Sequence, residues 1–250
     1  ILLRLDLNVP IKNGIIKDET RINKILPIID FLLKKKSKIL IISHIGRPNG
    51  KKEESLSLKP ICENLKTKLN QDIRLIKKDI FELKKEDLFK DTKYQIIVLE
   101  NIRFYREEEK NDDNFSKHLA KLGDLYVNDA FSCSHREHAS VSKITKFIPS
   151  YAGLQLETEI NALKKVTSEI KKPISCIVGG SKISTKIGLI KNLIPKFDHI
   201  IIAGGMANNI LSYKGNPTGK SLKEKDCDKI IDDIFKTAKI HSCSITFPED

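Results

Sequence analysis

The chain has 250 residues, 40% of them hydrophobic, which is enough to bury one large core or two smaller ones. Its apolar runs are too short to cross a membrane, and its first residues lack the basic leader and cleavage site of a signal peptide. A formal net charge of +12 admits nucleic acid, an anionic membrane surface or small phosphorylated ligands as partners.

Short β-rich apolar runs alternate with segments of helical periodicity along the chain. The first strand is expected at residues 2–7, followed by a helix over 22–33 that Thr20 is placed to cap. Further strands are expected at 38–43, 95–100, 124–128, 174–178 and 199–203, and further helices at 58–69 and 157–170. Such alternation predicts an α/β fold with parallel sheets covered by helices on both faces.

The helix at 157–170 ends before Pro173, after which a new strand begins, and we place the domain boundary there. The predicted architecture is two Rossmann-like parallel-sheet domains, the second incomplete. The predicted bounds are 1–153 for the first domain, 154–172 for an interdomain helix and 173–250 for the partial second domain. Because the sequence opens inside an expected strand, we expect residues to precede Ile1.

Polar residues follow the strands of the first predicted sheet at their carboxyl ends, where open parallel sheets bind ligands. Arg47, Arg103 and Arg136 each follow a different strand, and Arg21 stands at the start of the first helix. Each arginine alone would most often pair with a neighbouring acid. Their recurrence after successive strands instead predicts a cleft for a small molecule that carries phosphate and carboxylate groups.

Several motifs resemble those of the phosphoglycerate kinase family, and they cover the whole chain in the family's order. They are RLDLNVP at 4–10, DETR at 18–21, HIGRP at 44–48, SLKP at 57–60, ENIRF at 100–104, NDAF at 128–131, HREHAS at 135–140, GGSKISTKIG at 179–188 and GGMAN at 204–208. The resemblance implies reversible phosphoryl transfer between 1,3-bisphosphoglycerate with ADP and 3-phosphoglycerate with ATP, in glycolysis and gluconeogenesis. It also implies Mg²⁺ bound with the nucleotide, and we expect a monomer.

The same resemblance implies roles for individual residues. The substrate-binding residues would be Asp6, Leu7, Asn8, Arg21, His44, Ile45, Gly46, Arg47, Arg103 and Arg136. The catalytic residues would be Arg21, Lys182, Gly204 and Gly205, and the nucleotide phosphates would meet Lys182 and Lys186. No protein ligand for the metal is predicted within this chain.

The sequence departs from the family pattern at two places. Ser132-Cys133-Ser134 stands where Gly-Thr-Ala is common, and Ala203 replaces the first of three glycines. The family's glycine-rich loop and its acidic residues for nucleotide and magnesium are expected beyond Asp250. We therefore expect the 250-residue chain by itself to bind 3-phosphoglycerate weakly and to lack turnover.

Other interpretations remain open at this point. The charge of +12 suits a nucleic-acid-binding protein, although aromatic residues are only 6% of the chain and tryptophan is absent. A chain with the family fold could also bind substrate without activity. Residues 215–221 have one residue too few for a P-loop, and His135, His138 and Cys133 lack a second zinc-type pair. The absence of C-x-x-C pairs among the cysteines favours a reducing cytoplasm; they are Cys62, Cys133, Cys176, Cys227 and Cys243.

Overall fold

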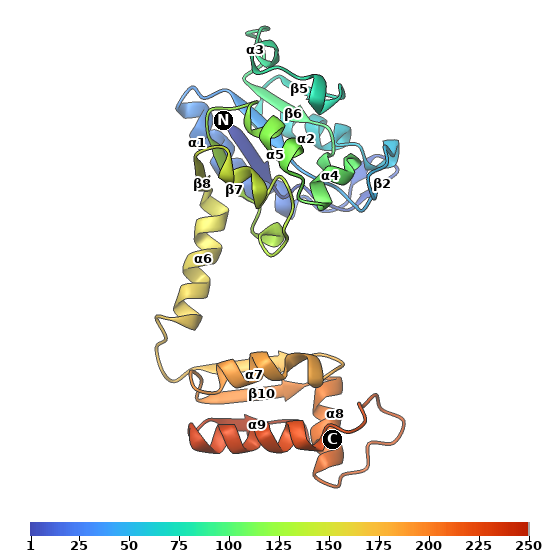
Figure 1. Cartoon of the computed structure of the whole chain (residues 1–250), viewed down its shortest axis with the longest axis vertical. Coiled ribbons are helices and arrows are strands. Elements are labelled where there is room, and N and C mark those ends of the chain that lie inside the picture. Colours follow the sequence, from blue (N-terminus) through green and yellow to red (C-terminus); the bar gives the residue numbers. More distant parts are fainter. Residues whose placement is uncertain (250) are drawn as a thin grey trace. The chain divides into compact units, whose positions relative to one another are not determined.

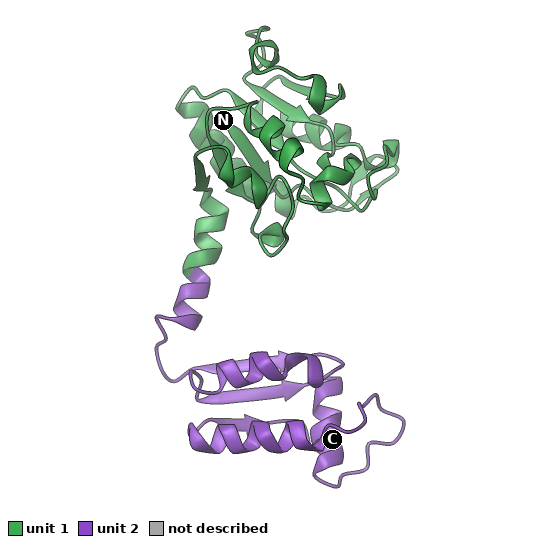
Figure 2. Cartoon of the chain, viewed as in Figure 1, with its two compact units in different colours: residues 1–161 green, residues 162–250 purple. Residues whose placement is uncertain are grey.

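The computed structural model describes residues 1–249 and divides into two compact units, residues 1–161 and 162–250 (Figure 2). Helix α6 (Leu154–Thr167) contains the boundary between them. No helix of residues 1–249 is long and apolar enough to cross a membrane. The assignment of a substrate or a nucleotide to either predicted domain stays a prediction.

Unit 1 is built on a six-stranded, fully parallel sheet with the strand order β5-β6-β4-β1-β7-β8 (Figure 1). The strands are β1 (Leu2–Leu5), β4 (Ile39–Ile42), β5 (Ile73–Ile76), β6 (Ile96–Leu99), β7 (Tyr126–Asp129) and β8 (Ser150–Ala152). A short antiparallel hairpin, β2 (Ile11–Lys12) and β3 (Ile15–Ile16), follows β1.

Every residue of β1, β4 and β6 is buried, which explains why these strands read as unbroken apolar runs. Successive side chains point to opposite faces of the sheet. Leu3 and Ile41 therefore join one core cluster, while Leu2 and Leu40 join the other. Packing on both faces of the sheet therefore holds the central strands in place, together with the edge at which they end.

Helices cover both faces of this sheet. The cluster with Leu3 includes α1 (Thr20–Lys34) and α2 (Lys59–Leu69), and the cluster with Leu2 includes α3 (Lys85–Leu88) and α5 (Asp113–Ala120). The short helix α4 (Arg106–Glu109) precedes α5. Five 3₁₀ turns complete the unit: η1 (Glu54–Leu56), η2 (Ile80–Glu82), η3 (Ile102–Phe104), η4 (Phe131–Cys133) and η5 (Lys143–Lys146).

Unit 2 contains a three-stranded parallel sheet with the order β11-β10-β9. Its strands are β9 (Ser175–Gly179), β10 (His199–Ala203) and β11 (Ser244–Thr246). Its helical elements are η6 (Ser184–Lys186), α7 (Ile187–Leu193), α8 (Gly205–Tyr213) and α9 (Asp228–Ile240). One core cluster joins apolar side chains of β9 and β10 to those of α7, α8 and α9.

The prediction of an α/β fold with two parallel sheets is confirmed. The predicted cap of the first helix is wrong, because Thr20 is already helical and its N–H donates to Asp18 Oδ1 at 2.8 Å. The expected helix at 157–170 instead spans Leu154–Thr167, since the Asp129 carboxylate accepts from the N–H groups of Gln155 and Leu156 and fixes an earlier start.

Candidate functional site

The carboxyl edge of the unit 1 sheet is tied together by hydrogen bonds from the residues that follow its central strands. Ser43, directly after β4, donates its hydroxyl to the Leu5 carbonyl of β1 at 2.8 Å and accepts from the Leu7 N–H at 3.1 Å. Both Ser43 and Leu7 are buried. The chain therefore leaves β1 and β4 in a fixed register, which places Asp6 and Asn8 beside the segment that begins at His44.

Asp6, Arg21 and Ser132 meet at this edge from three elements. Arg21, in the first turn of α1, donates through Nη1 to both Asp6 oxygens at 2.9 and 2.8 Å. The Ser132 hydroxyl, in η4 after β7, donates to Asp6 Oδ2 at 2.6 Å. The Arg21 side chain is 48% exposed, against 14% for Asp6. Arg21 is thus anchored through one nitrogen while the rest of its guanidinium faces solvent.

A second group forms around Gly46. The Gly46 N–H donates to Asn8 Oδ1 at 3.0 Å, and its carbonyl accepts from Arg103 Nη1 at 3.0 Å. Gly46 has a φ of +64°, and a Cβ atom there would lie 2.7 Å from Leu56 Cδ2. The backbone conformation therefore favours glycine, and a side chain here would also require Leu56 to shift.

Asn101 supports this loop, although sequence reasoning did not select it. Its Nδ2 donates to the Ile45 carbonyl at 2.8 Å and to the Leu56 carbonyl at 3.0 Å, and its Oδ1 accepts from the Arg103 N–H at 3.1 Å. The sequence signal that could have selected Asn101 is its position inside the ENIRF motif. Asn101 joins the loop after β4 to the turn after β6.

Arg103 is a buried cation whose hydrogen bonds are incomplete. Its exposure is 2%, and Nε and Nη2 are fully buried without a hydrogen-bond partner among residues 1–249. The nearest acid is Glu109, whose Oε1 lies 3.6 Å from Nε. Burial and the charge of Arg136 lower the pKa of Arg103, although a guanidinium remains a cation at neutral pH. A buried cation of this kind is stabilised by an anion that accepts from its free nitrogens.

His44 is buried against Arg4, whose Nη2 lies 3.0 Å from His44 Nδ1. Burial first, and then the positive charges of Arg4, Arg103 and Arg136, lower the pKa of His44 to about 2. The imidazole is therefore neutral at physiological pH. The pKa of His138 is also lowered, to about 4, mainly by burial.

The remaining predicted residues are less constrained. Ile45 is buried, and both its N–H and its carbonyl are engaged by the Asn101 side chain. Arg47 is exposed and Arg136 half-buried, and neither side chain has a hydrogen bond or ion pair with any residue of 1–249. The two guanidiniums are available to a ligand at the same edge as Arg103.

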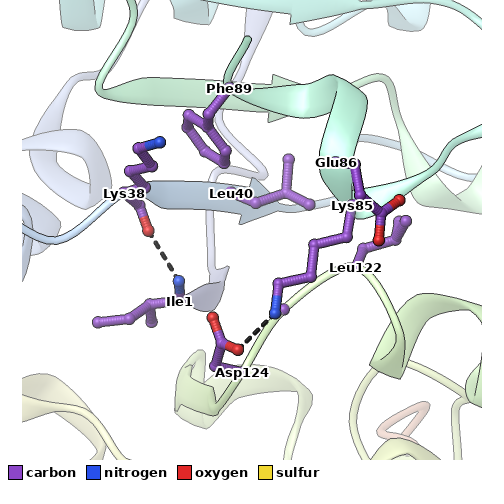
Figure 3. A pocket seen from close by; sticks show the side chains of 9 residues that line it. Ile1, Lys38, Leu40, Lys85, Glu86, Phe89, Leu122 and Asp124 are labelled. Carbon is purple, nitrogen blue, oxygen red and sulfur yellow. Dashed lines mark hydrogen bonds and ion pairs between the residues drawn. The ribbon is translucent and has the colours of Figure 1, made fainter. Parts of the chain in front are cut away.

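Two pockets of unit 1 lie at opposite edges of the sheet. A pocket of about 180 Å³ is lined by Asp6, Arg21 and Ser132 at the carboxyl edge. The larger pocket, about 500 Å³, lies where the strands begin; there the Ile1 amino group donates to the Lys38 carbonyl at 2.7 Å (Figure 3). Ligands of parallel sheets bind beyond the carboxyl ends, which favours the smaller pocket and the arginines beside it.

In unit 2, glycines bring two loops into close contact. Gly204 has a φ of +66° and a ψ of −152°, and the Met206 N–H donates to the Gly180 carbonyl at 2.9 Å. A Cβ atom on Gly205 would lie 3.2 Å from both Cα and O of Ser181. The first N–H groups of α8 have no partner within the helix, as at any helix start. Lys182 and Lys186 lie between β9 and α7, and both are exposed.

The described residues show no group of three or more His, Cys, Asp or Glu side chains that could hold a metal ion. The acids of the unit 1 edge are already engaged: Asp6 with Arg21 and Ser132, and Asp129 with the start of α6. The side chains present here do not fit a magnesium ion, and no chemical step is assigned to one.

The fold is that of an α/β protein whose parallel sheet gathers buried and half-buried guanidiniums at its carboxyl edge. The phosphoglycerate kinase family model matches residues 1–250, and the chain belongs to the phosphoglycerate kinase family.

Relatives agree with this assignment over the whole chain. The phosphoglycerate kinase of Wolbachia pipientis subsp. Culex pipiens (strain wPip) is 48% identical over all 250 residues, and that of Dictyoglomus turgidum is 41% identical. The phosphoglycerate kinase structure from Coxiella burnetii has a TM-score of 0.88 at 36% identity and 99% coverage of this chain. That from Pyrococcus horikoshii OT3 has a TM-score of 0.76 at 28% identity, also with 99% of this chain covered.

The chain spans 63% of the length of both curated relatives, and 62% and 64% of the two solved chains. Its residues thus correspond to a little under two thirds of a protein of this family.

Proposed function

We propose that this chain contributes the 3-phosphoglycerate site of a phosphoglycerate kinase, which transfers a phosphoryl group reversibly between 1,3-bisphosphoglycerate with ADP and 3-phosphoglycerate with ATP. The proposal rests mainly on the hydrogen bonds that the Arg103 guanidinium lacks. Among residues 1–249, Nε and Nη2 of this buried guanidinium have no hydrogen-bond partner, although Nε lies 3.6 Å from Glu109 Oε1, and Nη1 donates to the Gly46 carbonyl. A phosphate or carboxylate oxygen would complete those hydrogen bonds.

The substrate carries charge at both ends, and the edge offers two cationic groups. Arg47, Arg103 and Arg136 suit the phosphate that does not react, since planar guanidiniums bind phosphate oxygens in pairs. Arg21, held by Asp6 and half-exposed, suits the reacting carboxylate end. Asn8 and the Gly46 loop would hold the substrate's position between them.

In the transfer, a carboxylate oxygen of 3-phosphoglycerate forms a bond to the terminal phosphorus of ATP while the bond from that phosphorus to the bridging oxygen breaks, and ADP leaves. The protein's task is to align the two reactants and to neutralise charge on the transferred group. Arg21, Lys182 and the N–H groups of Gly204 and Gly205 are the proposed sources of that neutralisation. Lys182 and Lys186 would meet the nucleotide phosphates. Magnesium bound with the nucleotide, a monomeric state and a cytoplasmic location stay predictions.

Isothermal titration of the 250-residue chain tests the substrate site. We expect 3-phosphoglycerate to bind at least about tenfold more tightly than glycerate, because glycerate lacks the phosphate that Arg47, Arg103 and Arg136 would hold. The same titration on Arg103→Ala should show a marked loss for 3-phosphoglycerate and inorganic phosphate, and little change for glycerate. Equal affinities of 3-phosphoglycerate and glycerate for the unaltered chain would contradict the proposal.

A further inference from the structure

We infer that Arg4 is a positioning residue that holds His44 as a neutral imidazole with its proton on Nε2, and that Glu108 holds Arg4 in place through Ser140. The inference deepens the proposed function and rests on it, because His44 belongs to the proposed 3-phosphoglycerate site. The proposed contacts hold His44 in one protonation state and one orientation before any ligand binds.

The direction of the Arg4–His44 hydrogen bond is fixed by chemistry. Arg4 is fully buried in β1, and its Nη2 lies 3.0 Å from His44 Nδ1. A guanidinium carries only donors and stays protonated in proteins, so Nδ1 must be the acceptor. The imidazole proton then resides on Nε2. A second proton on Nδ1 would set a donor against a donor, which excludes the imidazolium form.

Other groups near His44 also oppose its protonation. Arg103, Arg136 and His138 all oppose a positive charge there, and the Cys133 Sγ lies 4.0 Å from Nδ1. The lowering of the His44 pKa to about 2 agrees with this geometry. The neutral state therefore holds across the physiological range.

The guanidinium of Arg4 cannot turn away from His44, because its other nitrogens are also engaged. Nη1 donates to the Leu5 carbonyl, and Nε donates to Ser140 Oγ at 3.1 Å. Ser140 in turn donates its hydroxyl to Glu108 Oε1 at 2.7 Å and its N–H to Oε2 at 2.8 Å. Glu108 is fully buried, and its carboxylate is the acid to which Arg4 connects through this hydroxyl. The three side chains form one chain of hydrogen bonds that ends on His44.

Nε2 is the free nitrogen of His44. Nε2 has no hydrogen-bond partner among residues 1–249, and it is not among their fully buried unpartnered atoms, so solvent reaches it. His44 therefore presents one N–H donor throughout the physiological pH range. The group of the substrate that it meets must be an acceptor, such as a carboxylate or phosphate oxygen.

Nitrogen NMR of the chain labelled with ¹⁵N-histidine reads the tautomer directly, without any ligand. For His44 we expect the Nε2–H form between pH 5 and 8, with no titration near its ordinary pKa of 6.5. In Arg4→Met we expect a mixture of tautomers, and 3-phosphoglycerate binding weakened about tenfold through the loss of one oriented donor. Arg4→Lys keeps a cationic donor and should keep the Nε2–H form. Arg74→Met, at an exposed arginine of β5, is the matched control and should change neither readout.

Because Arg4→Met leaves Glu108 buried without its cation, the double variant Arg4→Met, Glu108→Gln removes both charges and tests the same point. A His44 that carries its proton on Nδ1 in the unaltered chain, or that titrates between pH 5 and 8, overturns the inference. So does an Arg4→Met, Glu108→Gln chain whose His44 tautomer and 3-phosphoglycerate affinity are both unchanged. Failure of the unaltered chain to bind 3-phosphoglycerate, with the tautomer as expected, would instead count against the proposed function alone.

Discussion

In unit 1 the carboxyl edge of the sheet carries buried charged side chains held by hydrogen bonds, whereas in unit 2 the same edge carries glycines and exposed lysines. Arg103 is 2% exposed and anchored on the Gly46 carbonyl at 3.0 Å. Lys182 and Lys186 are exposed beside Gly204, whose φ is +66°. The side chains of the first edge are fixed by the fold, as in a preorganised site. The second edge has a glycine backbone that allows close approach and exposed cationic side chains around it.

The largest effect is expected at Arg21, the one predicted catalytic cation of unit 1. Arg21→Ala is made in a phosphoglycerate kinase of the relatives' length that carries these 250 residues in place of its matching region. Turnover should fall about a hundredfold or more, because removing one donor to developing charge typically has an effect of that size. Affinity for 3-phosphoglycerate should stay within about threefold, since the contact strengthens mainly in the transition state. A coupled kinase assay and titration separate the two. Turnover within about threefold of the unaltered enzyme contradicts the role.

Arg103 is buried and held by a hydrogen bond to the Gly46 carbonyl, whereas Arg47 is exposed. Arg103→Ala should weaken 3-phosphoglycerate binding by roughly tenfold to a hundredfold, because a buried hydrogen bond to a charged group contributes about 1.5 to 3 kcal/mol. Arg47→Ala should weaken it by only a few-fold, since an exposed ion pair contributes at most about 1 kcal/mol. Raising the salt concentration should reduce the Arg47 contribution and leave that of Arg103 largely unchanged. Titration at two ionic strengths decides, and the reverse ranking would show that burial is not what prepares this edge.

Gly204 tests the role of backbone in unit 2. Gly204→Ala forces a side chain into a conformation close to glycine-only backbone space, and we expect unit 2 to lose about 1 to 3 kcal/mol of stability. Gly188→Ala is the control, because a Cβ atom there meets nothing within 4 Å and alanine favours helix α7. Hydrogen exchange of β9 and β10 measures the loss, while β1 and β4 of unit 1 should exchange unchanged. Equal behaviour of the two variants would contradict the strain at Gly204.

His44 should also give unit 1 a pH-dependent stability. Below pH 6.5 the unfolded chain binds a proton on this histidine, whereas the folded chain, with a His44 pKa of about 2, does not. Stability is therefore lost as pH falls from 6.5 toward 2, at about 1.4 kcal/mol per pH unit. His44→Gln should remove roughly 2 kcal/mol of the loss between pH 7 and 5. Hydrogen exchange of β1 and β4 at the two pH values measures it. His241→Gln, at an exposed histidine of unit 2, should leave the loss intact.

The sequence predicted the central strands well because burial on both faces makes them continuous apolar runs. β6, for example, was expected at 95–100 and spans Ile96–Leu99. Five strands were missed: β2 and β3 have only two residues each, β5 and β11 are partly buried, and β8 is exposed. Ile73–Ile76 contains an exposed arginine, and Ser150–Ala152 is exposed throughout, so neither carries a strong apolar pattern.

For the candidate site, sequence reasoning could place charged residues after strands but not their partners. It selected Arg103, yet nothing in the sequence indicated that Gly46 and Asn101 would anchor it from the loop after β4 and the turn after β6. Arg4 and Glu108 lay inside or beside quoted motifs without an assigned role. Their connection passes through Ser140, which is 136 residues from Arg4 in the chain. Contacts over such separations depend on tertiary packing that local patterns do not encode.

We propose that the carboxyl edge of the unit 1 sheet binds 3-phosphoglycerate through Nε and Nη2 of Arg103, which lack a hydrogen-bond partner among residues 1–249. The most direct measurement is an NMR titration of the chain labelled at its arginine side chains and backbone amides. We expect saturable shifts of the Arg103 Nε–H and of the Gly46 N–H, with the signals of Arg74 unchanged as the internal control. Saturable binding that leaves Arg103 and Gly46 unshifted while other residues respond would contradict this proposal.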